Sequence, residues 1–86
     1  MPPYLAEQLK EQGNSYFKKG EYEQAISFYS QAIQQNASNP LLYTNRANAR
    51  LKLKLWQDVI DDCLRSIDLM RANMKAFYFL GMHFLV

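Results

Sequence analysis

Three small residues, Gly13, Ala47 and Gly81, follow one another at equal intervals of 34 positions, which we call the repeat period. In units of that length, large and small residues recur at matching positions. Position 4 holds Leu9, Tyr43 and Phe77, position 11 holds Tyr16, Arg50 and Phe84, position 20 holds Ala25 and Val59, position 24 holds Tyr29 and Cys63, and position 27 holds Ala32 and Ser66. Small residues let two helices approach closely, and large ones fill the space between them. This period predicts stacked helical repeats.

The spacing of apolar residues predicts five helices, at about 5–18, 22–35, 41–53, 56–70 and from Asn73 to the end. Gly20 is suited to end the first helix. Asn39 is a suitable N-cap for the third, with Pro40 at its first position. We therefore expect an all-α chain.

The period and the matched residue sizes resemble the tetratricopeptide repeat (TPR), although Arg50 and Ser66 replace the usual aromatic residue and alanine. The resemblance implies one domain, a short TPR superhelix. Repeat one would span 6–39 and repeat two 40–73, each a helix-turn-helix unit, and 74–86 would be the first helix of an incomplete third repeat.

Composition narrows the possible functions. At 86 residues the chain is one small domain, and its net charge of +2 does not call for nucleic acid. It has no secretory signal and no apolar run of the length that spans a bilayer, so we expect neither export nor membrane insertion. Cys63, the only cysteine, is compatible with a reducing compartment, so we expect a cytoplasmic location, with the nucleus as the alternative. We expect no metal and no cofactor, because clustered Cys/His ligands and a glycine-rich phosphate loop are missing.

The C-terminal stretch 76–86 has no formally charged side chain, and no partner helix follows it. Terminal repeats normally carry a polar outer face. We therefore expect a shortened copy of a longer protein. The alternative is a contact surface, which closes against a second copy or another protein through the last helix. Either case predicts self-association.

In each hairpin, positions 2, 5, 6 and 9 of the first helix share one face, predicted to line a concave groove. This face carries Lys10 and Asn14 in repeat one, Asn45 in repeat two and Lys75 in repeat three. Ammonium and amide groups are hydrogen-bond donors suited to carboxylates. A peptide C-terminus presents such a carboxylate, so we predict capture of a chain end.

The segments 9–14, 43–47 and 74–81 resemble the dicarboxylate-clamp TPR domains of chaperone cofactors. The resemblance implies binding of the Glu-Glu-Val-Asp tail of heat-shock chaperones of the seventy- and ninety-kilodalton classes. Lys10 and Lys75 would bond the carboxylates, Asn14 and Asn45 the main-chain terminus, and Leu41 with Phe79 the apolar side chain. Phe79 stands where a second basic residue is usual. This departure is similar to the chaperone-linked U-box ubiquitin ligases of the CHIP type, although the chain contains no U-box.

Other interpretations remain open at this stage. Lys10 is also placed to pair with Glu7 or Glu11, and Phe79 to join the core. Cys63 is predicted to be a buried, inert thiol, and a group of acidic residues on the fourth helix to be a solvated face: Asp58, Asp61 and Asp62. No catalytic constellation is visible, so we expect a binding module and not an enzyme. The alternative function is a scaffolding or self-assembly module that uses the apolar last helix.

Overall fold

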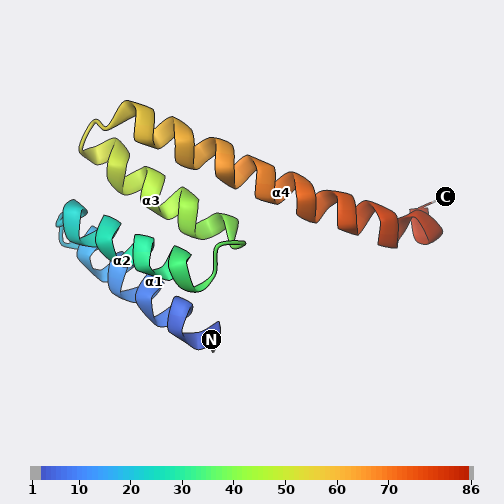
Figure 1. The fold of residues 1–86 in the computed structure, drawn as a ribbon, viewed down its shortest axis with the longest axis horizontal. Helices are drawn as coiled ribbons and strands as arrows, with labels where there is room; N and C mark the ends of the chain where they lie inside the picture. Colours follow the sequence, from blue (N-terminus) through green and yellow to red (C-terminus); the bar gives the residue numbers. More distant parts are fainter. Residues whose placement is uncertain (1–2, 86) are drawn as a thin grey trace.

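The computed structural model describes the backbone of residues 3–85 and the side chains of residues 4–74. These residues form four helices, α1 (Pro3–Lys18), α2 (Tyr22–Gln35), α3 (Pro40–Lys52) and α4 (Trp56–Leu85). Figure 1 shows α1 and α2 as one antiparallel hairpin and α3 with the first part of α4 as a second. Because α3 also packs against α2, the two hairpins stack. No strand occurs within residues 3–85, and the all-α prediction is confirmed.

The connections repeat along with the helices. Gly20 has φ +78°, and Lys54, which lies one repeat period later, has φ +61°. A left-handed conformation costs a residue with a Cβ about 1–2 kcal/mol, a cost that Gly20 avoids and Lys54 bears. Between the hairpins, Asn39 Oδ1 accepts a hydrogen bond from the Leu41 amide at 3.0 Å, and Pro40 opens α3. This predicted cap is confirmed.

Tyr29 lies at the centre of the core. Its side chain is buried together with Ala25 and Ala49, and four partly buried side chains pack against this cluster: Tyr16, Phe17, Tyr22 and Ile26. A Cβ added to Gly13 would lie only 2.6 Å from Cε1 of the Tyr29 ring. The small residue at position 8 is therefore required because an aromatic ring from α2 crosses α1 there.

The two departures from the repeat pattern are polar contacts between helices. Arg46 and Arg50 of α3 form ion pairs with Asp62 of α4 at 2.7 and 2.8 Å, and Arg46 Nη1 also donates to the Ser30 hydroxyl of α2 at 3.1 Å. The Ser66 hydroxyl donates to the Pro40 carbonyl at 3.1 Å. Arg50 and Ser66 thus replace apolar packing with bonds that hold α4 against α3.

Three predictions about α4 are wrong. The helix predicted to begin near Asn73 does not form separately, because α4 runs without a break from Trp56 to Leu85. Cys63 is exposed, since no described helix covers its side of α4 as α3 covers Tyr29. Asp62 is not part of a solvated face, because its pairing with two arginines compensates for its burial. The repeat boundaries 6–39, 40–73 and 74–86 remain predictions.

Over the described residues, no helix is both long enough and apolar enough to cross a lipid bilayer.

Replacing Gly13 with alanine tests the contact with Tyr29. Helix propensity alone would stabilise the variant by about 1 kcal/mol. Overpacking against the buried ring costs about 1–3 kcal/mol, so we expect Gly13→Ala to lower the free energy of unfolding in urea. Ser15→Ala, at an exposed position of the same helix, is the control and is expected to be neutral or slightly stabilising. A rise in stability for Gly13→Ala would contradict the contact.

Asp62→Asn keeps the shape of the side chain and removes its charge. Breaking a buried ion pair costs about 3–5 kcal/mol, and the two arginines retain some contact with water, so we expect a loss of about 2–3 kcal/mol in urea unfolding. Asp61→Asn is the matched control, because Asp61 is exposed and accepts only from Gln57 among the described residues. Equal effects of the two substitutions would show that the Asp62 network does not stabilise the fold.

Candidate functional site

Asn14 of α1 and Asn45 of α3 lie together, as the groove prediction requires. Asn45 Nδ2 lies 3.5 Å from Asn14 Oδ1, at the outer limit of a hydrogen bond. The Tyr29 hydroxyl of α2 donates to the same Asn14 oxygen at 2.6 Å, which is the stronger contact. Three helices therefore meet at one asparagine oxygen.

A pocket of about 110 Å³ opens at this junction. The side chains that line it come from the first three helices: Asn14, Phe17, Tyr29, Asn45 and Asn48. Because Tyr29 occupies the Asn14 oxygen, the Asn14 amide nitrogen is left to donate. The pocket is therefore rich in neutral donors, which suits a carboxylate or a main-chain carbonyl.

Lys10 lies one helical turn before Asn14 on α1, which places the two residues on the same face. Its ammonium group pairs with Glu7 and lies 3.8 Å from the Glu11 carboxylate. The Lys10 side chain is 17% exposed, and that of Glu7 is 57% exposed. The alternative pairing considered for Lys10 is thus present in the molecule without a ligand.

Leu41 is 58% exposed in the first turn of α3. The positions 41, 45 and 48 lie on one face of that helix, so Leu41 continues the line of Asn45 and Asn48 toward the start of α3. The side chains of Lys75 and Phe79, the other two predicted site residues, lie outside the described part of the structure.

Tyr29 is the site residue that the sequence pattern does not reveal, because position 24 indicates a core residue. Burial raises the pKa of its hydroxyl above the usual value of 10.0, and the nearby Glu11 carboxylate raises it further. The hydroxyl therefore stays protonated at neutral pH and donates a hydrogen bond to Asn14 Oδ1. The hydroxyl of a buried tyrosine usually needs a hydrogen-bond partner. This general rule is the one feature from which the role of Tyr29 could have been predicted.

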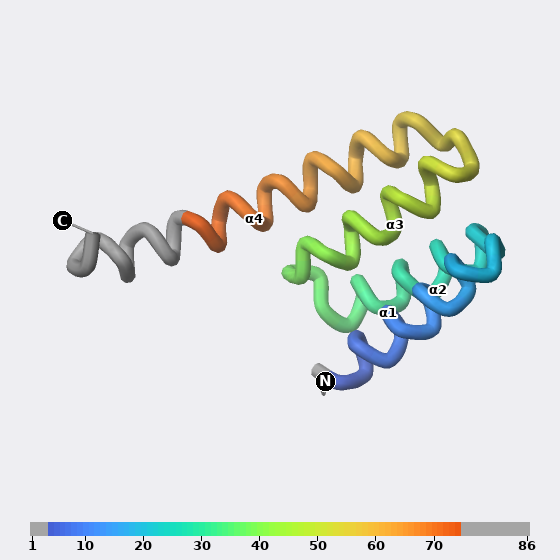
Figure 2. Tube along the Cα trace, turned by 180° about the vertical axis from the view of Figure 1, so that it is seen from behind, coloured from blue at the N-terminus to red at the C-terminus, as the bar shows by residue number. Residues whose placement is uncertain are grey.

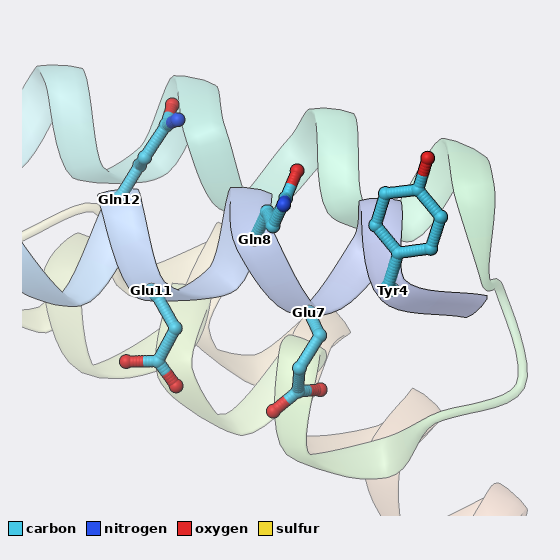
Figure 3. A pocket seen from close by; sticks show the side chains of 5 residues that line it. All are labelled: Tyr4, Glu7, Gln8, Glu11 and Gln12. Carbon is cyan, nitrogen blue, oxygen red and sulfur yellow. The ribbon is translucent and has the colours of Figure 1, made fainter. Parts of the chain in front are cut away.

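A larger and more open hollow of about 530 Å³ lies along α1. Figure 3 shows Tyr4, Gln8 and Gln12 in one row and Glu7 and Glu11 in another, which point to opposite sides of the helix. A single helix supplies all five residues, and their only charges are negative. This hollow has no opposing wall and no cation to bind a carboxylate, so the smaller pocket between the helices is the better candidate.

Comparison with known proteins identifies the class to which this arrangement belongs. A family model described as TPR repeat matches residues 13–54. The second TPR of Spaghetti (RPAP3), solved with the HSP90 peptide SRMEEVD, has a TM-score of 0.78 and is 38% identical; the match covers 93% of this chain and 74% of that one. The chain belongs to the tetratricopeptide repeat family, whose fold is a non-catalytic interaction fold.

Curated relatives are much longer than this chain. Human serine/threonine-protein phosphatase 5 is 45% identical over 73 residues, which are 85% of this chain and 15% of the phosphatase. The E3 ubiquitin-protein ligase CHIP of Arabidopsis thaliana is 42% identical over 78 residues, 91% of this chain and 28% of the ligase. The chain therefore spans between about a seventh and about a quarter of these two relatives, and the similarity concerns the TPR segment.

Tyr29→Phe tests the bond that positions Asn14. We expect a loss of about 1 kcal/mol in the free energy of unfolding at pH 7, the net value of one hydrogen bond. The pKa of Tyr29 is raised in the folded state, so the unfolded chain releases this proton first. The stabilisation is complete below about pH 10 and is lost as the pH rises above it, so the difference between wild type and variant should shrink there.

Tyr22→Phe is the control, since no hydroxyl bond to Tyr22 is found among residues 4–74. Urea unfolding at pH 7 and at about pH 10.5 measures both variants. A Tyr29→Phe variant as stable as wild type at both values would contradict the bond.

Proposed function

We propose that the groove face of α1 and α3 binds the acidic C-terminal tail of a heat-shock chaperone, a Glu-Glu-Val-Asp sequence, through a dicarboxylate clamp. The observation that carries this proposal is the meeting of Asn14 and Asn45 at a small donor-rich pocket, one turn from Lys10. The arrangement offers neutral amides at the pocket and a cation one helical turn away from it. A peptide terminus presents a carboxylate and a main-chain carbonyl close together, which matches these donors.

Within this proposal, Lys10 and Lys75 bond carboxylates and Asn14 with Asn45 binds the main-chain terminus. Leu41, exposed at the start of α3, packs against the apolar side chain together with Phe79. The second TPR of Spaghetti (RPAP3), solved with the HSP90 peptide SRMEEVD, supports the assignment of the ligand. Chaperones of the seventy-kilodalton class, a cytoplasmic location and a link to the ubiquitin pathway belong to the same proposal.

The ion pair of Lys10 does not prevent binding. Surface ion pairs contribute about 0–1 kcal/mol, and Glu7 remains largely in water. A ligand carboxylate that is also held by Asn14 makes a better partner, because hydrogen bonds to charged groups contribute about 1.5–3 kcal/mol. The tail therefore displaces Glu7 at small cost, and Lys10 is already restricted in its motion before binding.

The test is a titration, followed by fluorescence anisotropy, with labelled Ser-Arg-Met-Glu-Glu-Val-Asp and its C-terminally amidated form. We expect the free acid to bind more tightly, with an affinity that falls as salt is added. Lys10→Ala should cost about 1.5–3 kcal/mol of binding free energy. Lys18→Ala, which removes another lysine from the same helix, should leave the affinity unchanged. Equal affinities of wild type and Lys10→Ala would refute the clamp.

A scaffolding or self-assembly module is the second candidate function. The observation in its favour is a line of exposed apolar side chains on α4, of which Trp56 is 58% and Leu64 56% exposed. Docking through such a surface responds weakly to salt, in contrast to the capture of a carboxylate.

A further inference from the structure

Helix α4 carries a continuous apolar surface, which we call the α4 stripe. Its members are each between 44% and 58% exposed and recur every three or four residues: Trp56, Ile60, Leu64, Ile67 and Met70. This spacing places them on one side of the helix. An exposed apolar line of this length marks a contact surface.

The repeat register identifies that partner. Residues one repeat period earlier form the corresponding line on α2, and there α3 covers them. Tyr22 and Ile26 pack against the core cluster that contains Ala49 of α3, and Ser30 bonds to Arg46 of α3. Since α3 spans 40–52, the segment one repeat period after it begins at Met74 and runs to the end of the chain. The α4 stripe is therefore shaped for residues 74–86.

Within one chain, this segment does not fold back against the α4 stripe, because α4 continues into it. In the first repeat the connection breaks the helix: Asn36 accepts from the Ser38 hydroxyl at 3.0 Å, Asn39 caps α3, and Pro40 begins it. The corresponding residues, Met70–Met74, have neither the proline nor the serine, and α4 continues through them. Figure 2 shows the helix unbroken up to the last coloured turn. A segment that prolongs a helix cannot fold onto the side of that helix.

We propose that two copies of this chain exchange residues 74–86, each copy laying this segment on the α4 stripe of the other. The exchange is reciprocal, as a two-fold dimer requires. It buries the stripe while keeping the backbone hydrogen bonds of α4 intact. The sequence of 76–86 has no formally charged side chain, so it suits the apolar stripe.

The exchange has a consequence for the proposed tail-binding site, on which this step rests. Lys75 and Phe79 lie one repeat period after Leu41 and Asn45. Within residues 74–86 they therefore have the same repeat positions that Leu41 and Asn45 have in α3. Each groove then combines Lys10, Asn14 and Asn45 of one copy with Lys75 and Phe79 of the other. The complete clamp exists only in the dimer.

The oligomeric state is measured first, by sedimentation equilibrium of the whole chain over a range of concentrations. We expect a dimer for wild type. Ile60→Glu should raise the dimer dissociation constant about tenfold or more, because it places a charge in the apolar contact. Tyr4→Glu, which alters an exposed aromatic residue on α1, is the control and should leave the constant unchanged. A wild-type chain that stays monomeric at all concentrations would overturn the proposal.

The double substitution Ala72→Ser/Met74→Pro distinguishes exchange from simple contact between two stripes. It restores the Ser-Asn-Pro sequence that precedes and opens α3, so the segment can fold back onto its own stripe. We expect a monomer with unchanged helicity by circular dichroism. A double variant that remains a dimer would show that the stripes meet directly, and the exchange would be wrong.

A mixing experiment tests the shared site. Lys10→Ala and Lys75→Ala chains should each bind the tail peptide weakly. Unfolded and refolded together in equal amounts, they form mixed dimers in which one of the two grooves has both lysines, so about one quarter of the wild-type capacity should return. The same two substitutions in the Ala72→Ser/Met74→Pro background should show no recovery.

The outcomes separate the two proposals. No binding by wild type, with a dimer that the double substitution abolishes, leaves the exchange standing and refutes the tail-binding site. Binding by wild type without recovery in the mixture refutes the exchange and leaves the site in place.

Discussion

The rest of the structure depends on the contact between the Tyr29 ring and Gly13. A Cβ on residue 13 would lie 2.6 Å from the ring, so the Tyr29 ring of α2 packs directly against the backbone of α1 at this point. The same ring brings its hydroxyl to Asn14, one residue after the glycine. Because a buried hydroxyl needs a partner, the packing of the core also fixes the direction of the asparagine oxygen. The donor face of the pocket is thus a consequence of how the first hairpin packs.

The second hairpin is held in a different way. Arg50 and Ser66 depart from the apolar pattern, and both contribute polar bonds between α3 and α4. Asp62 is shared by Arg46 and Arg50, and Arg46 reaches back to Ser30 of α2. Buried ion pairs add little net stability over apolar packing, but they penalise every arrangement that leaves a charge unpaired. The network therefore specifies where α4 lies without the usual aromatic residue at the position of Arg50.

Much of the fold could be predicted from periodicity, since Gly13, Ala25, Ala32 and Ala47 are buried where the repeat pattern requires small residues. The meeting of Asn14 and Asn45 could also be predicted, because helical spacing places both residues on the same predicted face. The predictions that failed concern residues whose environment is set by contacts between helices that are distant in the sequence. The burial of Asp62 and the exposure of Cys63 are set by which helix covers which side of α4, and the role of Tyr29 by a hydroxyl that a size pattern ignores.

The path of α4 shows why a repeat pattern alone does not determine connectivity. Periodicity gives 74–86 the same relation to α4 that α3 has to α2, but only Asn39 and Pro40 force a turn in the first case. Methionine, arginine and alanine at 70–72 favour a helix, so the connection gains intrahelical hydrogen bonds by staying straight. The consequence is that the apolar stripe on the same helix stays exposed to water. The unfavourable hydration free energy of this stripe is removed only when another surface covers it. The local preference of a few residues thus keeps α4 continuous and leaves its apolar stripe exposed.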